Sequence, residues 1–268
     1  MDSVTKEIFH FQSRSKELGL NLNYSKCEVI GLSLTTTERW NETPYNFIPV
    51  NPQMATLLGA PIGRGGVDKA IASQCATLQT ARRRLSFLSS HEALYLLKHS
   101  LSIPKLQYLL RTAPCFLSGE LQEYDYILSN AVMSITNTSL DATALSQAAL
   151  PVRWGGLGIR SAITVAPSAF ISSLLSSETM ICQLLPQRAM PYRDPLADEA
   201  ISKWRQLGGS SIPTGSESFL LRSWDNELCS ATATSISTIG NAKTVARLIA
   251  CRGQGSGSMV HGYMPCPQ

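Results

Sequence analysis

The chain has 268 residues, of which 44% are hydrophobic and 16% are charged, and its net charge is +4. This length suggests one or two domains with a buried core, and the apolar content argues against disorder. No apolar run approaches the ~18 residues of a membrane helix, and the N-terminus lacks the basic start and apolar stretch of a secretory signal. We therefore expect an intracellular protein of the nucleus or cytoplasm, without a membrane-spanning segment. Nothing in the sequence indicates its oligomeric state.

Residues 1–65 are expected to form a small unit with one helix and short strands. Near-helical spacing of apolar residues predicts a helix over 3–18, which Gly19 can end in the left-handed conformation. Alternation of apolar and polar residues predicts a strand over 20–24. Further short strands are expected at 29–34, at 47–50 and at 57–63, the last ending in a turn.

From residue 66 onward the apolar period becomes helical. The segment Ser89-x-x-Glu92 is a capping box that predicts a helix over 91–101, and Pro104 suits the first turn of another helix over 104–112. The first apolar stripe comprises Val67, Ile71, Cys75, Leu78, Leu85 and Leu88. Two more helices are expected at about 119–135 and 141–149, followed by a turn-rich segment at 151–158.

The last third is also expected to be helical. Asp194 and Pro195 form an N-cap and a favoured first position, ahead of a face that contains Trp204. The segment Thr214-x-x-Glu217 predicts the start of a further helix that contains Trp224. A final helix is expected near 241–251, before a tail at 252–268 that is rich in Gly, Ser and Pro.

The positive charge is concentrated in one part of the chain. Residues 66–115 carry seven basic and two acidic side chains, a net charge of +5, whereas the remaining segments nearly balance. A local excess of Lys and Arg is the electrostatic footprint of a polyanion partner. A solvated helix face would give the same pattern, so composition alone leaves both interpretations open.

We find no pattern of an autonomous active site. The glycines at 59–66 lack the ending of a P-loop, and those at 155–158 do not match the dinucleotide fingerprint. No Asp-Asp or Asp-x-Asp pair is present, so no site for two divalent metal ions is evident. The seven cysteines and four histidines lack the spacing of a zinc site, which predicts reduced thiols and no bound metal. The acidic cluster Glu120, Glu123 and Asp125 is interpreted as the first turn of a helix.

Four blocks occur in order along nearly the whole chain. Residues 19–28 read Gly-Leu-Asn-Leu-Asn-Tyr-Ser-Lys-Cys-Glu, and residues 57–63 read Leu-Leu-Gly-Ala-Pro-Ile-Gly. Residues 150–160 read Leu-Pro-Val-Arg-Trp-Gly-Gly-Leu-Gly-Ile-Arg, and the fourth block begins with Ala-Arg-Leu-Ile-Ala at 246–250. Together they resemble the C-terminal part of the reverse transcriptases of non-LTR retrotransposons, which are RNA-directed DNA polymerases.

The resemblance implies a mainly α fold, a helical thumb-like bundle with a small N-terminal α+β remnant of a polymerase palm. It implies a palm-end remnant at 1–65, a thumb-like domain at 66–160 and a helical C-terminal extension with a flexible tail at 161–268. Lys26 matches a lysine that follows the catalytic strands and would be an accessory residue. The primer-grip segment would comprise Leu58, Gly59, Ala60 and Pro61. The expected nucleic-acid-binding residues of the thumb are Arg82, Arg83, Arg84, Lys98, Lys105 and Arg111.

The sequence departs from the family in lacking the catalytic Tyr/Phe-x-Asp-Asp motif, which would lie before residue 1. The complete enzymes hold Mg²⁺ with these carboxylates. The resemblance therefore implies a truncated fragment that is not an enzyme by itself, has no cofactor and binds the backbone of an RNA–DNA or DNA duplex without sequence preference. Two alternatives stay open. The chain could be a helical protein-interaction module with no nucleic-acid role, which the apolar stripes and four tryptophans support, or an enzyme whose upstream part is missing from this sequence.

Overall fold

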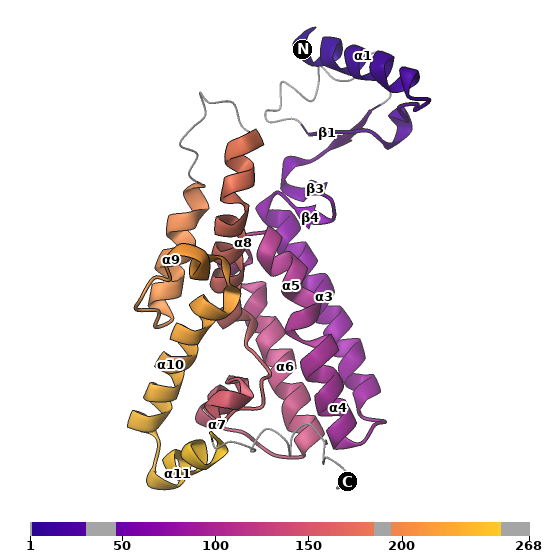
Figure 1. Ribbon diagram of the computed structural model, residues 1–268. Coiled ribbons are helices and arrows are strands. Elements are labelled where there is room, and N and C mark those ends of the chain that lie inside the picture. Colours follow the sequence, from indigo (N-terminus) through magenta and orange to yellow (C-terminus); the bar gives the residue numbers. More distant parts are fainter. Residues whose placement is uncertain (1, 31–46, 185–193, 253–268) are drawn as a thin grey trace, which may run out of the picture.

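The computed structural model describes residues 2–30, 47–184 and 194–252. The protein is mainly helical, as expected. Figure 1 shows a small N-terminal unit at one end of an elongated arrangement of helices. The helices fall into two groups that lie side by side, one formed by residues of the middle of the chain and the other by residues of its last third.

The N-terminal unit contains one helix and two pairs of very short strands. Strand β1 pairs with β2 in parallel, and β3 pairs with β4 in an antiparallel hairpin. The elements are α1 (Asp2–Glu17), the 3-10 turn η1 (Tyr24–Lys26), β1 (Glu28–Ile30), β2 (Ile48–Val50), the 3-10 turn η2 (Pro52–Met54), β3 (Thr56–Leu57) and β4 (Ala60–Pro61).

Two strand predictions for this unit need correction. Residues 20–24 do not form a strand, because the Asn23 side chain accepts a hydrogen bond from the Ser25 backbone N–H and caps η1 instead. The single strand expected at 57–63 is a hairpin whose turn is Leu58-Gly59. Most of the strand expected at 29–34 lies outside the described residues, which include its first part as β1.

The rest of the described chain is helical. The helices of the middle are α3 (Arg64–Leu85), α4 (Ser90–Leu96), α5 (Ile103–Thr112), α6 (Glu120–Thr136) and α7 (Ala142–Ala149), with α4 continuing as the π-helical turn η3 (Leu97–Leu101) and short 3-10 turns η4 (Cys115–Leu117) and η5 (Val152–Trp154). The helices after residue 160 are α8 (Ala162–Leu184), α9 (Pro195–Gln206), α10 (Leu221–Ile239) and α11 (Ala242–Cys251), with the 3-10 turn η7 (Gly215–Phe219) before α10.

Local capping explains where several of these helices begin. Ser89 and Glu92 form the complete predicted capping box at the start of α4. Asp141 accepts a hydrogen bond from the Ala144 backbone N–H and caps α7, and Asp194 caps α9 ahead of Pro195. The box expected at Thr214 does not form, because its side chain makes no cap hydrogen bond and only the 3-10 turn η7 follows.

Helix α8 is the centre of the main hydrophobic core. It contacts α5, α6, α9 and α10, and residues 165–172 are buried along its first half. One buried cluster runs from Val67 of α3 to Leu228 of α10. The core therefore joins the segments 66–160 and 161–268, whose assignment as separate domains stays a prediction.

Helix α8 also refines the expectation about membrane segments. From the absence of a long uninterrupted apolar run we expected no membrane-spanning helix. By length and composition alone, however, α8 is long and apolar enough to cross a bilayer. Of its most apolar window, 44% is buried inside the protein, and α8 is packed on several sides by other helices. Core helices of soluble proteins pass the same test, so this helix is weak evidence for a membrane.

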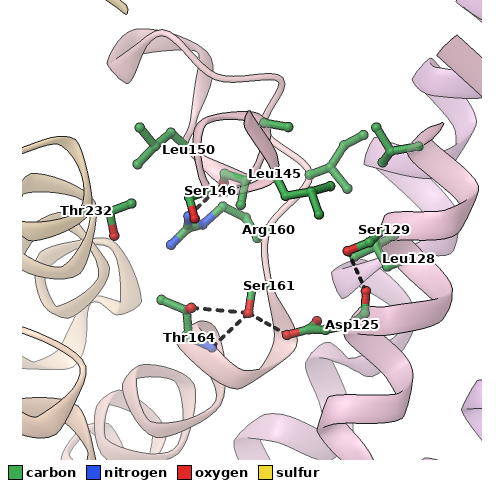
Figure 2. A pocket seen from close by; sticks show the side chains of 14 residues that line it. Asp125, Leu128, Ser129, Leu145, Ser146, Leu150, Arg160, Ser161, Thr164 and Thr232 are labelled. Atoms are coloured by element: carbon green, nitrogen blue, oxygen red, sulfur yellow. Dashed lines mark hydrogen bonds between the residues drawn. The ribbon is translucent and has the colours of Figure 1, made fainter. Parts of the chain in front are cut away.

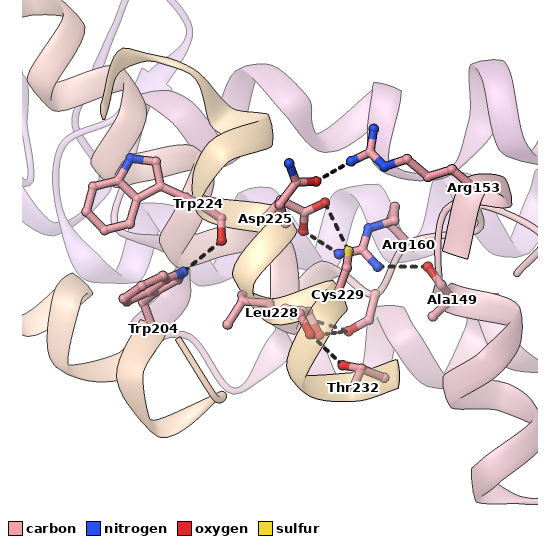
Figure 3. A network of polar contacts seen from close by, with 12 residues as sticks. Ala149, Arg153, Arg160, Trp204, Trp224, Asp225, Leu228, Cys229 and Thr232 are labelled. Atoms are coloured by element: carbon pink, nitrogen blue, oxygen red, sulfur yellow. Dashed lines mark hydrogen bonds and ion pairs between the residues drawn. The ribbon is translucent and has the colours of Figure 1, made fainter. Parts of the chain in front are cut away.

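A pair of tryptophans connects the last helices to this core. Trp204 of α9 and Trp224 of α10 are fully buried, and their rings pack edge to face with centroids 5.0 Å apart. Trp204 Nε1 donates a hydrogen bond of 3.0 Å to the Trp224 carbonyl oxygen (Figure 3). Trp154 is half-buried beneath the guanidinium of Arg252, and Trp40 lies outside the described residues.

Among the described residues, Cys27, Cys75, Cys115, Cys182 and Cys229 are free thiols, as predicted. Burial raises the pKa of the Cys115 and Cys229 thiols to about 12 and that of Cys75 to about 11. These three side chains are buried and pack within the helical interior. Their chemistry is that of small apolar side chains rather than of nucleophiles.

Candidate nucleic-acid interface

The three consecutive arginines Arg82, Arg83 and Arg84 occupy the last turn of α3. Arg83 and Arg84 are exposed, and Arg82 is half-buried. None of the three forms an ion pair with a carboxylate of the described residues, so their charges are available to a partner. Cations at a helix C-terminus also interact favourably with the helix dipole, which helps to stabilise this arrangement.

Lys105 and Arg111 are exposed on α5, which follows α4 and leads back toward the N-terminal unit. The hairpin β3–β4 packs against both α3 and α5 at that end of the helices (Figure 1). The predicted cations therefore do not form one cluster. From Arg64, next to the hairpin, to Arg83, the rise of an α-helix gives a separation of about 28 Å.

Lys98 differs from the other predicted cations because it is half-buried. Burial lowers the pKa of its ammonium below the usual value for a lysine. Its side chain covers Gly158, where an added Cβ would lie 2.8 Å from Lys98 Cε. Lys98 thus links α4–η3 to the 151–158 segment, and its charge is less accessible than those of Arg83 and Arg84.

The predicted grip segment is the tip of the β3–β4 hairpin. Leu58 and Gly59 form its two-residue turn, with φ angles of 51° and 82°. Two-residue hairpin turns favour such positive φ angles because they match the twist of the strands, and a leucine rarely adopts one. Leu58 is 90% exposed, whereas Ala60 is half-buried and Pro61 is buried.

This tip is fixed to the helices by a residue that the sequence did not single out. The Tyr108 hydroxyl on α5 donates a hydrogen bond of 2.6 Å to the main-chain carbonyl oxygen of Leu58. The space that a side chain would occupy at Gly59 is open, with no atom of the described residues within 4 Å. Another molecule can therefore approach the backbone of the turn closely.

Lys26, the expected accessory residue, is exposed at the end of η1 in the N-terminal unit. It forms no ion pair with a carboxylate of the described residues. Figure 1 places η1 and β1 beyond the hairpin, away from the long helices. Lys26 thus lies at the same end of the protein as the predicted grip segment and far from Arg82, Arg83 and Arg84.

The conspicuous block at 150–160 is a structural junction rather than part of this surface. Arg160 donates hydrogen bonds to the Ala149 carbonyl oxygen and to the Asp225 carboxylate, which ties the end of α7 to α10 (Figure 3). The side chains of Arg160 and Asp225 are each 15% exposed. Arg153, from the same block, donates a hydrogen bond to the Asn226 side chain.

The glycines of this block are explained by close packing. An added Cβ at Gly155, where φ is 84°, would lie 2.9 Å from the Leu248 carbonyl oxygen of α11. At Gly156 it would lie 2.1 Å from the Leu150 carbonyl oxygen, which excludes any side chain without a shift of the backbone. Gly158 lies against Lys98.

A cavity of about 290 Å³ lies beside this junction, between α6, α7, α8 and α10 (Figure 2). Asp125 reaches from α6 to the start of α8, where its carboxylate accepts hydrogen bonds from the Ser161 hydroxyl and from the Ala162 and Ile163 backbone N–H groups. Burial raises the pKa of Asp125 above its usual value, despite these hydrogen bonds. Arg160 Nε is buried without a hydrogen-bond partner among the described residues. The cavity is polar enough to hold water, and its charged groups are already paired.

The described residues contain no group of three or more His, Cys, Asp and Glu side chains that could hold a metal ion. The acidic cluster at the start of α6 divides in the structure. Glu120 and Glu123 lie in the first turn, as interpreted from the sequence, whereas Asp125 caps α8.

The fold and these surfaces define a mainly helical protein with exposed cations on α3 and α5 and a hairpin that packs against one end of these two helices. Comparison of the chain with protein-family models, curated proteins and solved structures found no match. The family resemblance of the four sequence blocks is therefore a proposal.

Proposed function

We propose that this chain is a section of a non-LTR retrotransposon reverse transcriptase that binds a nucleic-acid duplex without sequence preference. The observation that carries the proposal is the set of exposed cations without carboxylate partners, on helices that also anchor the hairpin tip. Arg83 and Arg84 provide exposed positive charge at the end of α3, and Lys105 and Arg111 provide it on α5. Contacts between such cations and phosphates position a protein on a duplex and do not depend on the base sequence.

The proposal makes the chain a binding section and not a polymerase. Its sequence contains no Asp-Asp or Asp-x-Asp pair, and phosphoryl transfer by these polymerases uses carboxylates that hold two metal ions. In the complete enzyme, Mg²⁺ would be held by the catalytic motif that this sequence lacks. Incorporation of deoxynucleotides by the purified 268-residue chain would contradict this part of the proposal.

A salt titration tests duplex binding directly. The affinity of the chain for an RNA–DNA duplex should fall steeply between about 50 and 200 mM salt, because bound cations release counterions. The variant Arg82→Gln/Arg83→Gln/Arg84→Gln should bind more weakly and show a salt slope lower by about 2 to 3. The matched control Lys6→Gln/Arg14→Gln/Lys16→Gln removes the same charge from α1 and should bind almost normally. A flat salt dependence, or equal loss in both variants, would contradict the proposal.

A protein-interaction module is the second candidate, and one observation favours it. The N-terminal unit exposes apolar side chains, including Phe9 (67%), Leu18 (77%) and Leu20 (61%). Two of the four tryptophans that suggested this function are buried in the core and cannot contact a partner. If the triple arginine variant keeps a protein partner while the wild-type chain shows no duplex affinity, the interaction module is the better explanation.

A further inference from the structure

Exposed rings lie beside the arginines, at and after the turn that joins α3 to α4. Phe87, in this turn, is 87% exposed, and Tyr95 of α4 is 52% exposed. His91 and His99 are also exposed, and the rings of Tyr95 and His99 lie 4.6 Å apart between centroids. Positions 91, 95 and 99 recur every four residues, which places them on successive turns of one helix face. We call Phe87, His91 and Tyr95 the ring row.

The ring row is not required by the core. Helix α4 buries its other face through Ala93, and Leu97 of η3 is fully buried next to it. Single exposed apolar residues are ordinary in soluble proteins, but several exposed rings on a turn and on the short helix that follows it form a surface that another molecule can contact.

Arg83 and Arg84 lie within about one helical turn of Phe87, the first residue of this row. The Phe87 N–H donates to the Arg84 carbonyl oxygen at 3.2 Å, and the Leu88 N–H donates to the Leu85 carbonyl oxygen at 3.1 Å. The chain therefore continues to turn past the end of α3, so Phe87 stays close to Arg83 and Arg84. The carboxylate of Glu92, on α4, accepts hydrogen bonds from the Ser89 hydroxyl and the Ser89 backbone N–H.

Cations and flat exposed rings together fit one kind of partner. Single-stranded nucleic acid presents phosphates to the cations and unpaired bases that stack on the rings. A duplex hides the faces of its bases except at its ends, so a duplex would contact the cations through its phosphates and would not use the rings. The ring row therefore indicates unpaired nucleotides.

We propose that Phe87, His91 and Tyr95 form a stacking surface for unpaired nucleotides that continue from a bound duplex. This inference rests on the proposed function and extends its ligand from a duplex to a duplex with a single-stranded extension. In this arrangement Arg83 and Arg84 hold the phosphates at the junction, and the extension lies over α4, at the opposite end of α3 from the hairpin.

Fluorescence anisotropy with two labelled probes tests the inference. One probe is a blunt RNA–DNA duplex, and the other is the same duplex with a single-stranded extension. The wild-type chain should bind the extended probe more tightly. Tyr95→Ala and Phe87→Ala should each lower affinity for the extended probe by about tenfold and leave the blunt duplex unaffected. Tyr95→Phe keeps the ring and should bind like the wild type.

Tyr126→Ala is the matched control, since Tyr126 on α6 is 64% exposed and follows the acidic first turn of that helix instead of arginines. It should change neither affinity. Equal wild-type affinity for both probes, or an unchanged extension preference in the alanine variants, would overturn the inference and leave the proposed function intact. Absence of binding to either probe would overturn both. A loss of self-association in the ring variants, without an effect on either probe, would show that a second copy of the chain covers the row.

Discussion

Tyr108 of α5 holds the hairpin tip by a hydrogen bond of 2.6 Å to the carbonyl oxygen of Leu58, fifty positions earlier in the chain. Tyr108 is itself 52% exposed, so this contact lies at the surface of the protein. The bond couples the position of the hairpin to the helix that carries Lys105 and Arg111.

Removal of this hydrogen bond should loosen the hairpin without unfolding the helices. We expect Tyr108→Phe to lower the local free energy of opening of β3–β4 by about 1 kcal/mol, the ordinary net value of one hydrogen bond. Hydrogen exchange of the amides at 56–62 is the measurement. Tyr126→Phe is the control and should leave these exchange rates unchanged.

The ion pair between Arg160 and Asp225 should contribute to global stability. Arg160→Met keeps most of the apolar stem but leaves the Asp225 carboxylate with little solvent and no cation. We expect a loss of about 3 kcal/mol in the free energy of unfolding by urea. Arg14→Met breaks the exposed pair with Glu17, whose side chains are 68% and 60% exposed, and should cost less than about 1 kcal/mol. Similar losses in both variants would contradict the structural role of Arg160.

Asp125 should give the protein a pH dependence of a specific sign. Burial raises its folded-state pKa above the unfolded value, so its contribution to stability is present below about pH 4 and is lost as pH rises through the folded pKa. The measurement is the free energy of unfolding by urea at a series of pH values from about 4 upward. The free energy of unfolding of Asp125→Asn, relative to that of the wild type, should increase as the pH rises.

Glu227 should show the opposite sign and serves as the comparison. Hydrogen bonds from Ser210 and Ser211 lower the pKa of Glu227, so its contribution is present above about pH 4.3 and is lost as pH falls through the folded pKa. Glu227→Gln should therefore be least harmful at acidic pH. The same direction of change in both variants would show that one assignment is wrong.

Gly155 should tolerate no side chain. Gly155→Ala combines a positive φ with a contact of 2.9 Å to the Leu248 carbonyl oxygen, and we expect a loss of roughly 1–3 kcal/mol. Gly119→Ala, at a position with open space and a φ of −68°, should change stability by less than about 0.5 kcal/mol. Thermal unfolding of the two variants gives the comparison.

Local sequence signals predicted most of the helix boundaries. The caps at Ser89, Asp141 and Asp194 act within three residues of the chain, so their outcome depends little on the remainder of the fold. The hairpin was missed because Leu58 has a positive φ, which nothing in a leucine side chain indicates. Helix α8 was not predicted as an individual element. A helix that is buried on several sides has no polar face, so its sequence does not alternate between apolar and polar residues with a helical period. In addition, Pro167 lies inside this helix.

The candidate interface was predictable only as a set of charges. The sequence placed Arg83, Arg84 and Lys98 in one basic segment, but it could not show that Lys98 covers Gly158, sixty positions later in the chain. It also could not show that Tyr108 meets Leu58. Contacts between distant positions depend on how the helices pack, and no local pattern carries that information.

The central place of α8 has a consequence for synthesis of the chain. Helices α5 and α6 are synthesised before Ala162 to Leu184, so the apolar faces that they pack against α8 stay uncovered in the nascent polypeptide until α8 has left the ribosome. Chaperones that bind such faces should therefore associate with ribosomes still translating this message, and completion of α8 should release them.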